Sequence, residues 1–375
     1  MSERIAFIGK EVDVMLGFRG ELMAELRNKG HEIYAFSIDY DEKKIETVRN
    51  LGYIPVKYKL NGYSLNPLSE LTTIYRLWRL LKQHKITMSF CYFAKPVVYG
   101  TLAAYWAKVP RRIAKIEGLG RTFTKGKEKA SLKMRLARMV QSFLFKVALP
   151  KAEALIVLNR DDEQDLRAIC GKKMPTTVVL GGIGVCLDRF KHSPVPLDPI
   201  SFIFVGRLLD EKGIRYFIEA AQRIKQRYPN VEFKVLGAPV EKCGVTQKEL
   251  LQYVEEGTII YPGKVDDVVP YIEQSSVFVL PSYYREGVPR STQEALAIGR
   301  PVITTDSPGC RETVIDGENG FLIEPHNVEQ LVEAMEKLIS DRALMTSMGP
   351  RSRQFAESKF DVIRINKELI DLLNL

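Results

Sequence analysis

Short apolar runs alternate with amphipathic helical segments along the chain, and this alternation starts a second time near residue 200. Segments such as 22–30 and 68–84 place apolar residues at three- and four-residue steps, as helices do. The apolar runs, which we expect to be buried strands, are 4–9, 31–38, 87–93, 112–118, 154–159 and 176–182, then 200–206, 231–237, 257–263, 276–281 and 301–306. Strands that alternate with helices form parallel sheets, so two such series predict an α/β protein with two doubly wound, Rossmann-like domains.

The irregular stretch 186–199, with three prolines, separates the two series. We therefore expect an N-terminal domain over 1–185 and a second domain that begins at 186. The length of 375 residues suits two domains. No segment has the roughly 18–20 consecutive apolar residues that would span a bilayer, and the N-terminus has no signal-peptide pattern. The five scattered cysteines are typical of reduced thiols, so we expect a cytoplasmic protein.

Positive charge is concentrated in the first half of the chain. Residues 51–150 contain 19 Lys and Arg but 3 Asp and Glu, whereas the whole chain has a net charge of +9. Such a basic region predicts an anionic partner, which could be a membrane surface, a phosphate-bearing substrate or nucleic acid.

Ligands of doubly wound domains bind beyond the carboxyl ends of the strands, so the loops after the strands are the places to inspect. The strand 200–206 ends at Gly206, and Arg207 and Lys212 follow on a loop that opens a helix, whose N-terminus favours an anion. A solvated basic loop is the alternative interpretation. The loop matches neither a P-loop nor a GxGxxG motif, which gives ATPase and dehydrogenase functions little support.

Two carboxylates follow the strand 276–281. Glu286 falls in the loop, Pro289 suits the first turn of a helix, and Glu294 lies early on that helix. A third glycine-containing loop, SPGCRET at 307–313, is expected to open another helix. Neighbouring loops that offer backbone N–H groups, two cations and two carboxylates suit a nucleotide diphosphate sugar, although a Glu near a helix start is also a common dipole partner.

These motifs resemble the family-four retaining glycosyltransferases, which have two Rossmann-like domains facing a central cleft, the B-type fold. The resemblance rests on G-R-x4-K-G at 206–213 and E-x7-E at 286–294, followed by TTDSPGCRETV at 304–314. It implies a donor-binding domain over 186–359, an acceptor-binding domain over 1–185, and a C-terminal helix over 360–375 that crosses back to the first domain.

Two further stretches, GFRGEL at 17–22 and IEGLGRTFT at 116–124, are similar to a bacterial subgroup of this family. That subgroup extends polyprenyl-diphosphate-linked sugars in surface-polysaccharide and protein-glycosylation pathways. The resemblance therefore implies transfer of a hexose or N-acetylhexosamine from a nucleotide sugar, with UDP favoured over GDP as the nucleotide, to a membrane lipid-linked saccharide. A transferase with a soluble acceptor is an alternative.

The resemblance also implies a role for each residue. Arg207 and Lys212 would bind the donor diphosphate and stabilise charge on the leaving nucleotide. Glu286 would contact the donor sugar, and Glu294 would accept hydrogen bonds from the ribose. The other implied donor contacts are Gly9, Arg19, which we place at a helix start facing the diphosphate, Gly206, Gly287, Val288, Pro289, Gly309 and Cys310.

Glu117 stands where many relatives carry a histidine after the strand 112–118. We take it as the candidate acceptor-side base, with a structural carboxylate as the alternative. The triplet Asp39-Tyr40-Asp41 resembles the metal-binding D-x-D of the other glycosyltransferase fold, but it follows a strand of the first domain. We therefore expect no cofactor and no obligatory metal.

Other functions are weaker predictions. A nucleotide-sugar 2-epimerase shares the fold but needs acid/base residues, and the four histidines lie outside the loops assigned to the ligand. A nucleic-acid-binding module would explain the charge, but the sequence has neither a recognition helix nor an aromatic stacking platform. We expect no nucleic-acid partner.

The segment 125–151 carries eight Lys and Arg and a single acid, with apolar residues at helical steps. It predicts either a surface helix packed on its own domain or an interfacial helix on anionic lipid. In the second case the protein would associate peripherally with the inner face of the cell membrane. The cations expected near its start are Lys129, Lys133, Arg135 and Arg138.

Overall fold

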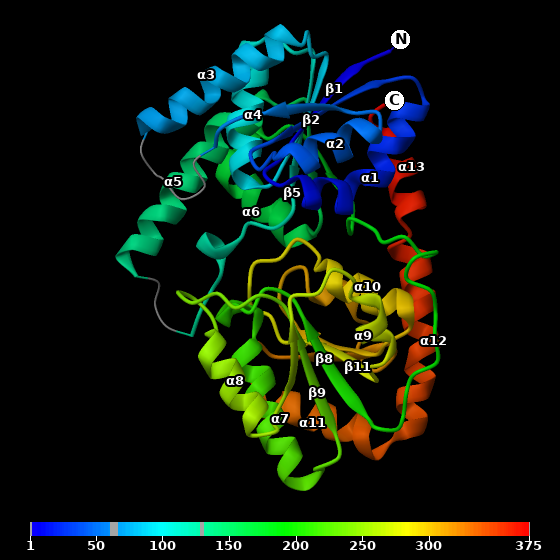
Figure 1. Cartoon of the computed structure of the whole chain (residues 1–375). Coiled ribbons are helices and arrows are strands. Elements are labelled where there is room, and N and C mark those ends of the chain that lie inside the picture. Colours follow the sequence, from blue (N-terminus) through cyan, green and yellow to red (C-terminus); the bar gives the residue numbers. More distant parts are fainter. Residues whose placement is uncertain (1, 61–66, 128–130, 375) are drawn as a thin grey trace. The chain divides into compact units, whose positions relative to one another are not determined.

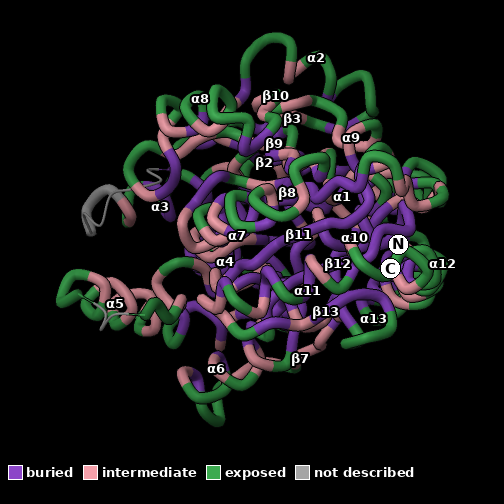
Figure 2. Tube along the Cα trace, turned by 90° about the horizontal axis from the view of Figure 1, so that it is seen from below, coloured by how far each residue is buried: buried purple, intermediate pink, exposed green. Residues whose placement is uncertain are grey.

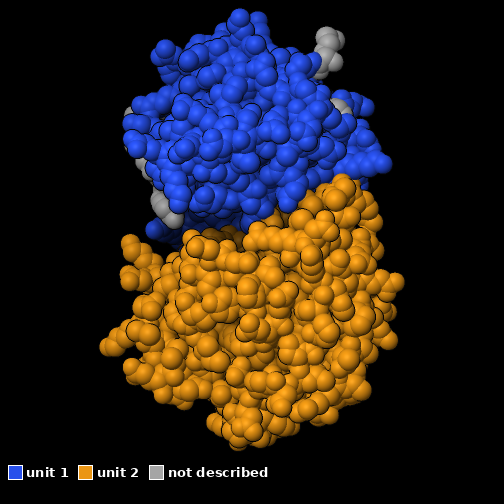
Figure 3. Space-filling model, turned by 45° about the vertical axis from the view of Figure 1, so that its right-hand side comes forward, with its two compact units in different colours: residues 1–122, 132–180, 365–375 blue, residues 123–131, 181–364 orange. Residues whose placement is uncertain are grey.

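The structure is a computed structural model that describes residues 2–60, 67–127 and 131–374. The chain divides into two compact units, shown in different colours in Figure 3. Unit 1 comprises residues 1–122, 132–180 and 365–375, and unit 2 comprises residues 123–131 and 181–364. The chain therefore leaves unit 1 and returns to it.

Unit 1 is built on a parallel sheet of seven strands in the order β3-β2-β1-β4-β5-β6-β7, counted over the described residues. The strands are β1 (Arg4–Ile8), β2 (Glu32–Ser37), β3 (Ile54–Lys57), β4 (Met88–Tyr92), β5 (Arg111–Ile116), β6 (Ala154–Val157) and β7 (Thr176–Val179). The central strands are apolar runs buried on both faces, as Figure 2 shows, which is the pattern of a sheet covered on both sides.

The α-helices of unit 1 follow its strands (Figure 1). α3, α4, α5 and α6 pack in series, and α4 lies against β4 and β5. The helices are α1 (Val12–Asn28), α2 (Glu42–Asn50), α3 (Pro67–Gln83), α4 (Ala94–Trp106), α5 (Leu132–Ala148) and α6 (Arg160–Cys170), with one-turn 3-10 helices at Arg121–Phe123, Leu149–Lys151 and Gly171–Lys173.

Unit 2 repeats the design with a parallel sheet in the order β10-β9-β8-β11-β12-β13, again over the described residues. Its strands are β8 (Ser201–Val205), β9 (Glu232–Leu236), β10 (Ile260–Gly263), β11 (Val277–Leu280), β12 (Val302–Thr305) and β13 (Gly320–Ile323). Its α-helices are α7 (Ile214–Arg227), α8 (Gln247–Glu255), α9 (Val269–Glu273), α10 (Arg290–Ile298), α11 (Val328–Ser340) and α12 (Arg342–Lys359), with 3-10 helices at Asp210–Lys212 and Arg311–Thr313.

The prediction of two doubly wound α/β domains is confirmed, because each sheet is parallel and its strands are connected through helices. Two edge strands were not expected. β3 contains a proline and has a single buried residue, Val56, while β13 begins at Gly320, so neither gives a strong apolar signal.

The prediction that SPGCRET opens a helix is wrong. Residues Arg311–Thr313 form one 3-10 turn, and the chain then proceeds to β13. The side chain of Asn319 accepts a hydrogen bond from Ile315 N at 2.8 Å, which closes a turn where a helix would have continued.

The last helix, α13 (Val362–Leu372), belongs to unit 1 from residue 365 onward. Its side chains Ile365, Leu369 and Ile370 are buried, and Arg111 Nη2 donates a hydrogen bond to Leu373 O. In the part of the chain that the structure describes, none of the helices is both long and apolar enough to cross a membrane.

Candidate functional site

The strand order of unit 2 reverses between β8 and β11, because β8 connects outward to β9 while β11 begins the other half of the sheet. In a doubly wound sheet, this switch point opens a crevice at the carboxyl ends of the strands. The loops that follow β8 and β11 carry Arg207, Lys212 and Glu286. The topology therefore places the predicted cations and the first carboxylate where a ligand is expected.

Gly213 allows the loop after β8 to lie directly against the end of β11. Its φ is +83°, and an added Cβ would lie 2.1 Å from Pro281 O, so a larger residue has no room. The backbone N–H groups of Tyr283 and Tyr284 both donate to Glu211 O at 2.9 Å. The two loops are thus joined through their backbones.

Lys212 and Glu286 form an ion pair across these loops, through Nζ and Oε1. Ser282 Oγ also donates a hydrogen bond to Glu286 Oε1 at 3.1 Å. Glu286 is 9% exposed, and Lys212 and Ser282 are among the partners that hold its carboxylate in this nearly buried position. Sequence reasoning missed Ser282, although its place two residues beyond β11 is the same signal that identified Glu286.

Tyr284 lies near both predicted diphosphate-binding cations. Its ring centroid is 5.8 Å from Arg207 Cζ and 5.7 Å from Lys212 Nζ. Arg207 is exposed at residue level, whereas the side chain of Lys212 is largely covered. Two cations grouped around one aromatic ring at a strand-end loop form an anion-binding arrangement.

Glu294 lies on α10 and is bonded to Arg290, whose Nε donates to Oε1 at 2.9 Å. Burial raises the pKa of Glu294 above its usual value, although the Arg290 guanidinium acts in the opposite direction. Pro289 is the N-cap of α10, one position before the first turn that we expected it to occupy. Lys212 thus pairs with Glu286, and Arg290 pairs with Glu294.

Gln293, which we did not predict, fixes the loop before α10. This buried side chain donates from Nε2 to Val288 O at 3.1 Å and accepts from Gly184 N at 3.1 Å. The segment from Gly287 to Pro289 is buried, so its backbone is positioned by the fold and its side chains are largely covered.

The loop after β12 packs on the loop that carries Glu286. Gly309 has a φ of +81°, and an added Cβ would lie 2.3 Å from Gly287 O. The Cys310 thiol is fully buried, 3.9 Å from Ser282 O, and burial raises its pKa to about 11. The thiol is thus protonated and enclosed, which leaves the backbone of Gly309 and Cys310 as the part suited to a ligand.

Arg19 is not at a helix start as expected, because α1 begins at Val12. The residue is 2% exposed, and its guanidinium stacks 3.5 Å from the centroid of the Tyr92 ring. Arg19 Nη2 donates to Glu117 Oε1 at 2.5 Å, while Nε and Nη1 have no hydrogen-bond partner among the described residues. Gly9 lies beside this cluster, since an added Cβ would be 1.9 Å from Tyr92 Oη.

Glu117 is enclosed between two cations, Arg19 and Lys115, with Lys115 Nζ 3.2 Å from Oε1. Burial acts to raise the pKa of Glu117, but the two cations outweigh it and lower the pKa below its usual value. Burial also lowers the pKa of Lys115. The carboxylate is therefore well stabilised in its charged form, which favours a structural role over proton abstraction.

The carboxylates of the D-x-D triplet have structural partners. Asp39 accepts hydrogen bonds from Val12 N at 3.0 Å and from Ser37 Oγ at 2.6 Å, and it pairs with Lys44. Asp41 is the N-cap of α2 and accepts from Lys44 N at 2.8 Å. Within the described ranges, no group of three or more His, Cys, Asp and Glu side chains gathers as metal ligands.

Residues 132–148 of the basic segment form α5, whose apolar stripe is exposed. Leu132 is 81% exposed, and Leu136, Met139 and Phe143 are 53%, 63% and 64% exposed. Figure 2 shows exposed and intermediate positions along this helix, and buried residues appear only at its end, at Phe145 and Ala148. A helix that is amphipathic and leaves its apolar side in solvent has an unpaired hydrophobic surface.

The four predicted cations of this segment are placed differently. Lys133 and Arg135 are exposed on α5. Arg138 is half-buried and donates from Nε to Thr122 O at 2.7 Å, so it holds the preceding turn. Lys129 lies outside the described residues.

Comparison with known proteins matches both halves of the chain to glycosyltransferase families. Residues 188–355 match the family described as "Glycosyl transferases group 1", and residues 4–159 match the family "Glycosyl transferase 4-like". The second match covers most of unit 1, and the first covers the loops that carry Arg207, Lys212, Glu286 and Glu294.

Three similar proteins span most of the chain. The N,N'-diacetylbacillosaminyl-diphospho-undecaprenol alpha-1,3-N-acetylgalactosaminyltransferase of Campylobacter jejuni is 27% identical over 367 residues, 94% of each chain. The UDP-Gal:alpha-D-GlcNAc-diphosphoundecaprenol alpha-1,3-galactosyltransferase of Escherichia coli is 25% identical, over 82% of this chain and 80% of the relative. Anabaena Alr3699/HepE, solved in complex with UDP, superposes with a TM-score of 0.75 over 99% of both chains at 17% identity, which shows a common fold.

Proposed function

Because this chain belongs to the group 1 glycosyltransferases, we propose that it transfers a hexose or N-acetylhexosamine from a UDP-linked donor to a polyprenyl-diphosphate-linked saccharide. The product would enter a surface polysaccharide or a glycoprotein glycan. The acceptor class follows from the two relatives whose names specify diphospho-undecaprenol acceptors. The nucleotide follows from the donor named for the Escherichia coli relative.

The observation that carries the donor half of the proposal is the grouping of Arg207, Lys212 and Glu286 at the switch point of unit 2. The two cations contact the donor diphosphate through charge-assisted hydrogen bonds. Their positive charge stabilises the nucleotide diphosphate as it leaves. No metal is needed for this step because the fixed cations supply the charge.

Glu286 contacts the donor sugar and stabilises an oxocarbenium-like transition state. Lys212 and Ser282 hold its carboxylate in place before the donor arrives, so less reorganisation is required during the reaction. Transfer retains the configuration at the anomeric carbon, as the family resemblance implies. Glu294 accepts hydrogen bonds from the ribose hydroxyls after it exchanges part of its bonding to Arg290.

The remaining predicted contacts complete the donor set. Gly206, Gly287, Val288, Pro289, Gly309 and Cys310 supply backbone groups on the loops described above. In unit 1, Arg19 Nε and Nη1 lack a hydrogen-bond partner among the described residues, and Gly9 lies beside this cluster; because both nitrogens are buried, contact with an anion requires the Arg19 side chain to shift. Glu117 is the predicted acceptor-side base, and its tight pairing with Arg19 and Lys115 supports instead a role in positioning Arg19.

The membrane half of the proposal rests on α5. Its exposed residues Leu132, Leu136, Met139 and Phe143 insert among lipid chains at the membrane surface, and Lys133 and Arg135 contact anionic headgroups. Basic side chains near an anionic surface contribute about 1 kcal/mol each. The protein thereby associates with the cytoplasmic face of the membrane, where a polyprenyl-linked acceptor is held.

Transfer assays test this function directly. A panel of UDP- and GDP-sugars is offered with a polyprenyl diphosphate-linked saccharide, in the presence and absence of EDTA, and the anomeric configuration of the product is read by NMR. We expect turnover with a UDP-sugar, retained configuration and full activity in EDTA. Complete and reversible loss of activity in EDTA would overturn the metal-independent mechanism, and turnover of the donor to an isomeric nucleotide sugar would indicate an epimerase.

A further inference from the structure

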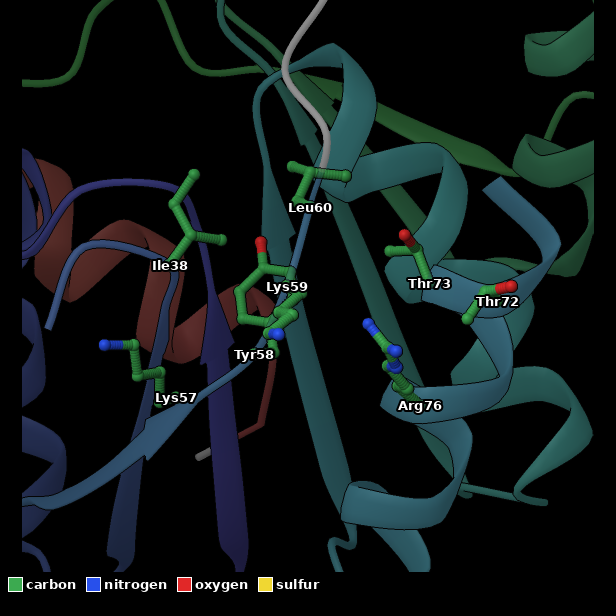
Figure 4. A pocket seen from close by; sticks show the side chains of 8 residues that line it. All are labelled: Ile38, Lys57, Tyr58, Lys59, Leu60, Thr72, Thr73 and Arg76. Atoms are coloured by element: carbon green, nitrogen blue, oxygen red, sulfur yellow. The ribbon is translucent and has the colours of Figure 1, made fainter. Parts of the chain in front are cut away.

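A cavity of about 600 Å³ lies in unit 1 between the end of β3 and α3 (Figure 4). This volume is within the range of about 300–1,000 Å³ that is usual for small-molecule sites. One wall is formed by Lys57, Tyr58 and Lys59, and the opposite wall by Thr72, Thr73 and Arg76. Nothing in the donor site described above uses these residues.

The lining of this cavity is positively charged. Lys57, Lys59 and Arg76 are all exposed, and none of the lining residues that the structure describes is acidic. Figure 4 shows Arg76 extending from α3 toward the β3 segment. None of the three cations pairs with a carboxylate among the described residues, and the sequence of 61–66, NGYSLN, contains no acid.

Lys57 has a partner of its own, since its Nζ donates to Tyr40 O at 2.7 Å. Arg76 and Lys59 are therefore the cations best suited to bind an anion from two sides. The hydroxyl-bearing residues Thr72 and Thr73 line the same cavity. The guanidinium of an arginine can donate two parallel hydrogen bonds to phosphate oxygens, and the ammonium of a lysine adds a compact positive charge, so the two together suit a phosphate group.

The cavity borders the carboxyl edge of the unit 1 sheet. Tyr58 lines it and donates from its hydroxyl to Gly9 O at 2.5 Å, at the end of β1. Gly9 in turn lies against Tyr92, on which Arg19 stacks. An anion in the cavity would therefore lie next to the strand ends of unit 1.

The surroundings of the cavity also suit a lipid. Leu71 and Tyr75, which are sequence neighbours of the lining residues Thr72 and Arg76 on α3, are each 55% exposed. α3 and α5 both pack on α4, and Figures 1 and 2 place them on the same side of unit 1. The helix that forms one wall of the cavity thus lies on the same side of unit 1 as α5, which carries the exposed apolar stripe.

We propose that this cavity binds the diphosphate group of the lipid-linked acceptor, with Arg76 and Lys59 as its direct ligands. The proposal rests on the proposed function, which requires a second diphosphate besides that of the donor. Arg207 and Lys212 in unit 2 are assigned to the donor, so the unit 1 cations are available for the acceptor. Free phosphate shares the same chemistry, and the experiment must separate the two.

The test uses two water-soluble acceptors that carry the same saccharide, one on a short prenyl diphosphate and one on a neutral alkyl group. Arg76→Gln and Lys59→Gln should each raise the KM for the diphosphate acceptor on the order of 10- to 100-fold, because each removes a charge-assisted contact. The KM values for the neutral acceptor and for the donor should not change. The matched control is Arg79→Gln, which removes an exposed arginine of α3 outside the cavity.

Unchanged kinetics with both acceptors would overturn the assignment, and so would an equal loss with both. Calorimetric titration of farnesyl diphosphate and of inorganic pyrophosphate, without donor, gives an independent measurement. We expect wild-type protein to bind farnesyl diphosphate more tightly than pyrophosphate, and Arg76→Gln to lose this binding. Equal affinity for the two would identify a free-phosphate site and refute an acceptor site.

The two failures are distinguishable. If the protein transferred sugar to no diphosphate acceptor, the proposed function would fail, while loss of farnesyl diphosphate binding in Arg76→Gln would still support the cavity as a prenyl diphosphate site. If transfer occurred but neither variant affected the acceptor KM, the function would stand and the cavity assignment would fall.

Discussion

Lys212 pairs with Glu286, so the loop after β8 and the loop after β11 are connected through the two side chains to which we assign the donor chemistry. In the assigned roles, Lys212 contacts the donor diphosphate while Glu286 contacts the donor sugar, so donor binding must rearrange this ion pair. Binding of the donor would replace one anion beside Lys212, the carboxylate, with another. Variants at the two positions should therefore differ in effect.

Lys212→Ala and Arg207→Ala should each raise the donor KM and slow transfer. Each removes a charge-assisted contact to the diphosphate, worth roughly 1.5–3 kcal/mol, which is about a 10- to 150-fold loss of kcat/KM. Steady-state kinetics with varied donor measure this, and Lys225→Ala, at a partly exposed position in the last turn of α7, is the control. Wild-type kinetics in both site variants would contradict the diphosphate assignment.

Glu286→Gln should fold normally and lose most of its turnover. The amide keeps the shape of the side chain and can still accept a hydrogen bond from Ser282, but it lacks the negative charge that stabilises an oxocarbenium-like state. Circular dichroism and kcat are the two measurements. A variant with unchanged kcat would exclude the carboxylate from the chemical step.

Glu294 should make donor binding dependent on pH. Its pKa is raised by burial, so it becomes protonated at a higher pH than an ordinary carboxyl group. Because the charged form is the better acceptor for the ribose hydroxyls, the donor KM should rise as the pH falls through this raised pKa. In Glu294→Gln the donor KM should be high at every pH, with kcat little changed. If this variant had the same pH profile of donor KM as the wild type, Glu294 would not be the ribose-binding carboxylate.

The α5 surface should govern membrane binding. Replacement of Leu136, Met139 and Phe143 by serine, or of Lys133 and Arg135 by glutamate, should reduce co-sedimentation with anionic liposomes and slow transfer to a lipid-linked acceptor. Activity on a short water-soluble acceptor should persist. Lys129 and Arg138 are less informative targets, because Lys129 is outside the described residues and Arg138 supports the turn at Thr122. Unaltered sedimentation would rule out α5 as the contact.

Arg19→Met should destabilise unit 1. The substitution leaves Glu117 buried with one cation instead of two, and breaking a buried ion pair costs about 3–5 kcal/mol. The lowered pKa of Glu117 means that its pairing stabilises the fold above the ordinary carboxyl pKa and that this stability is lost as the pH falls through the lowered value. Both tryptophans, Trp78 and Trp106, lie in unit 1, so denaturation followed by their fluorescence reports this unit. An unchanged denaturation midpoint would show that the Arg19–Glu117 pair contributes nothing to the stability of unit 1.

Much of the fold could be predicted because parallel strands buried on both faces are apolar runs, as β4 and β8 illustrate. The positions of Arg207, Lys212 and Glu286 followed from the rule that strand-end loops carry the ligand site. Contacts between residues that are distant in the sequence could not be predicted from the sequence pattern. Nothing in the spacing of Arg19 and Glu117, 98 residues apart, indicates their buried pairing, and no sequence pattern indicates that Lys59 and Arg76 line one cavity.

The return of α13 to unit 1 has a consequence for synthesis on the ribosome. Ile365, Leu369, Ile370 and Leu373 fill unit 1, yet they are translated after all of residues 181–364. Since domains fold largely in the order in which they emerge, unit 2 can collapse while unit 1 still lacks an apolar helix. Part of the apolar core of unit 1 therefore stays exposed to solvent until α13 has been synthesised. Packing of α13 then completes this core.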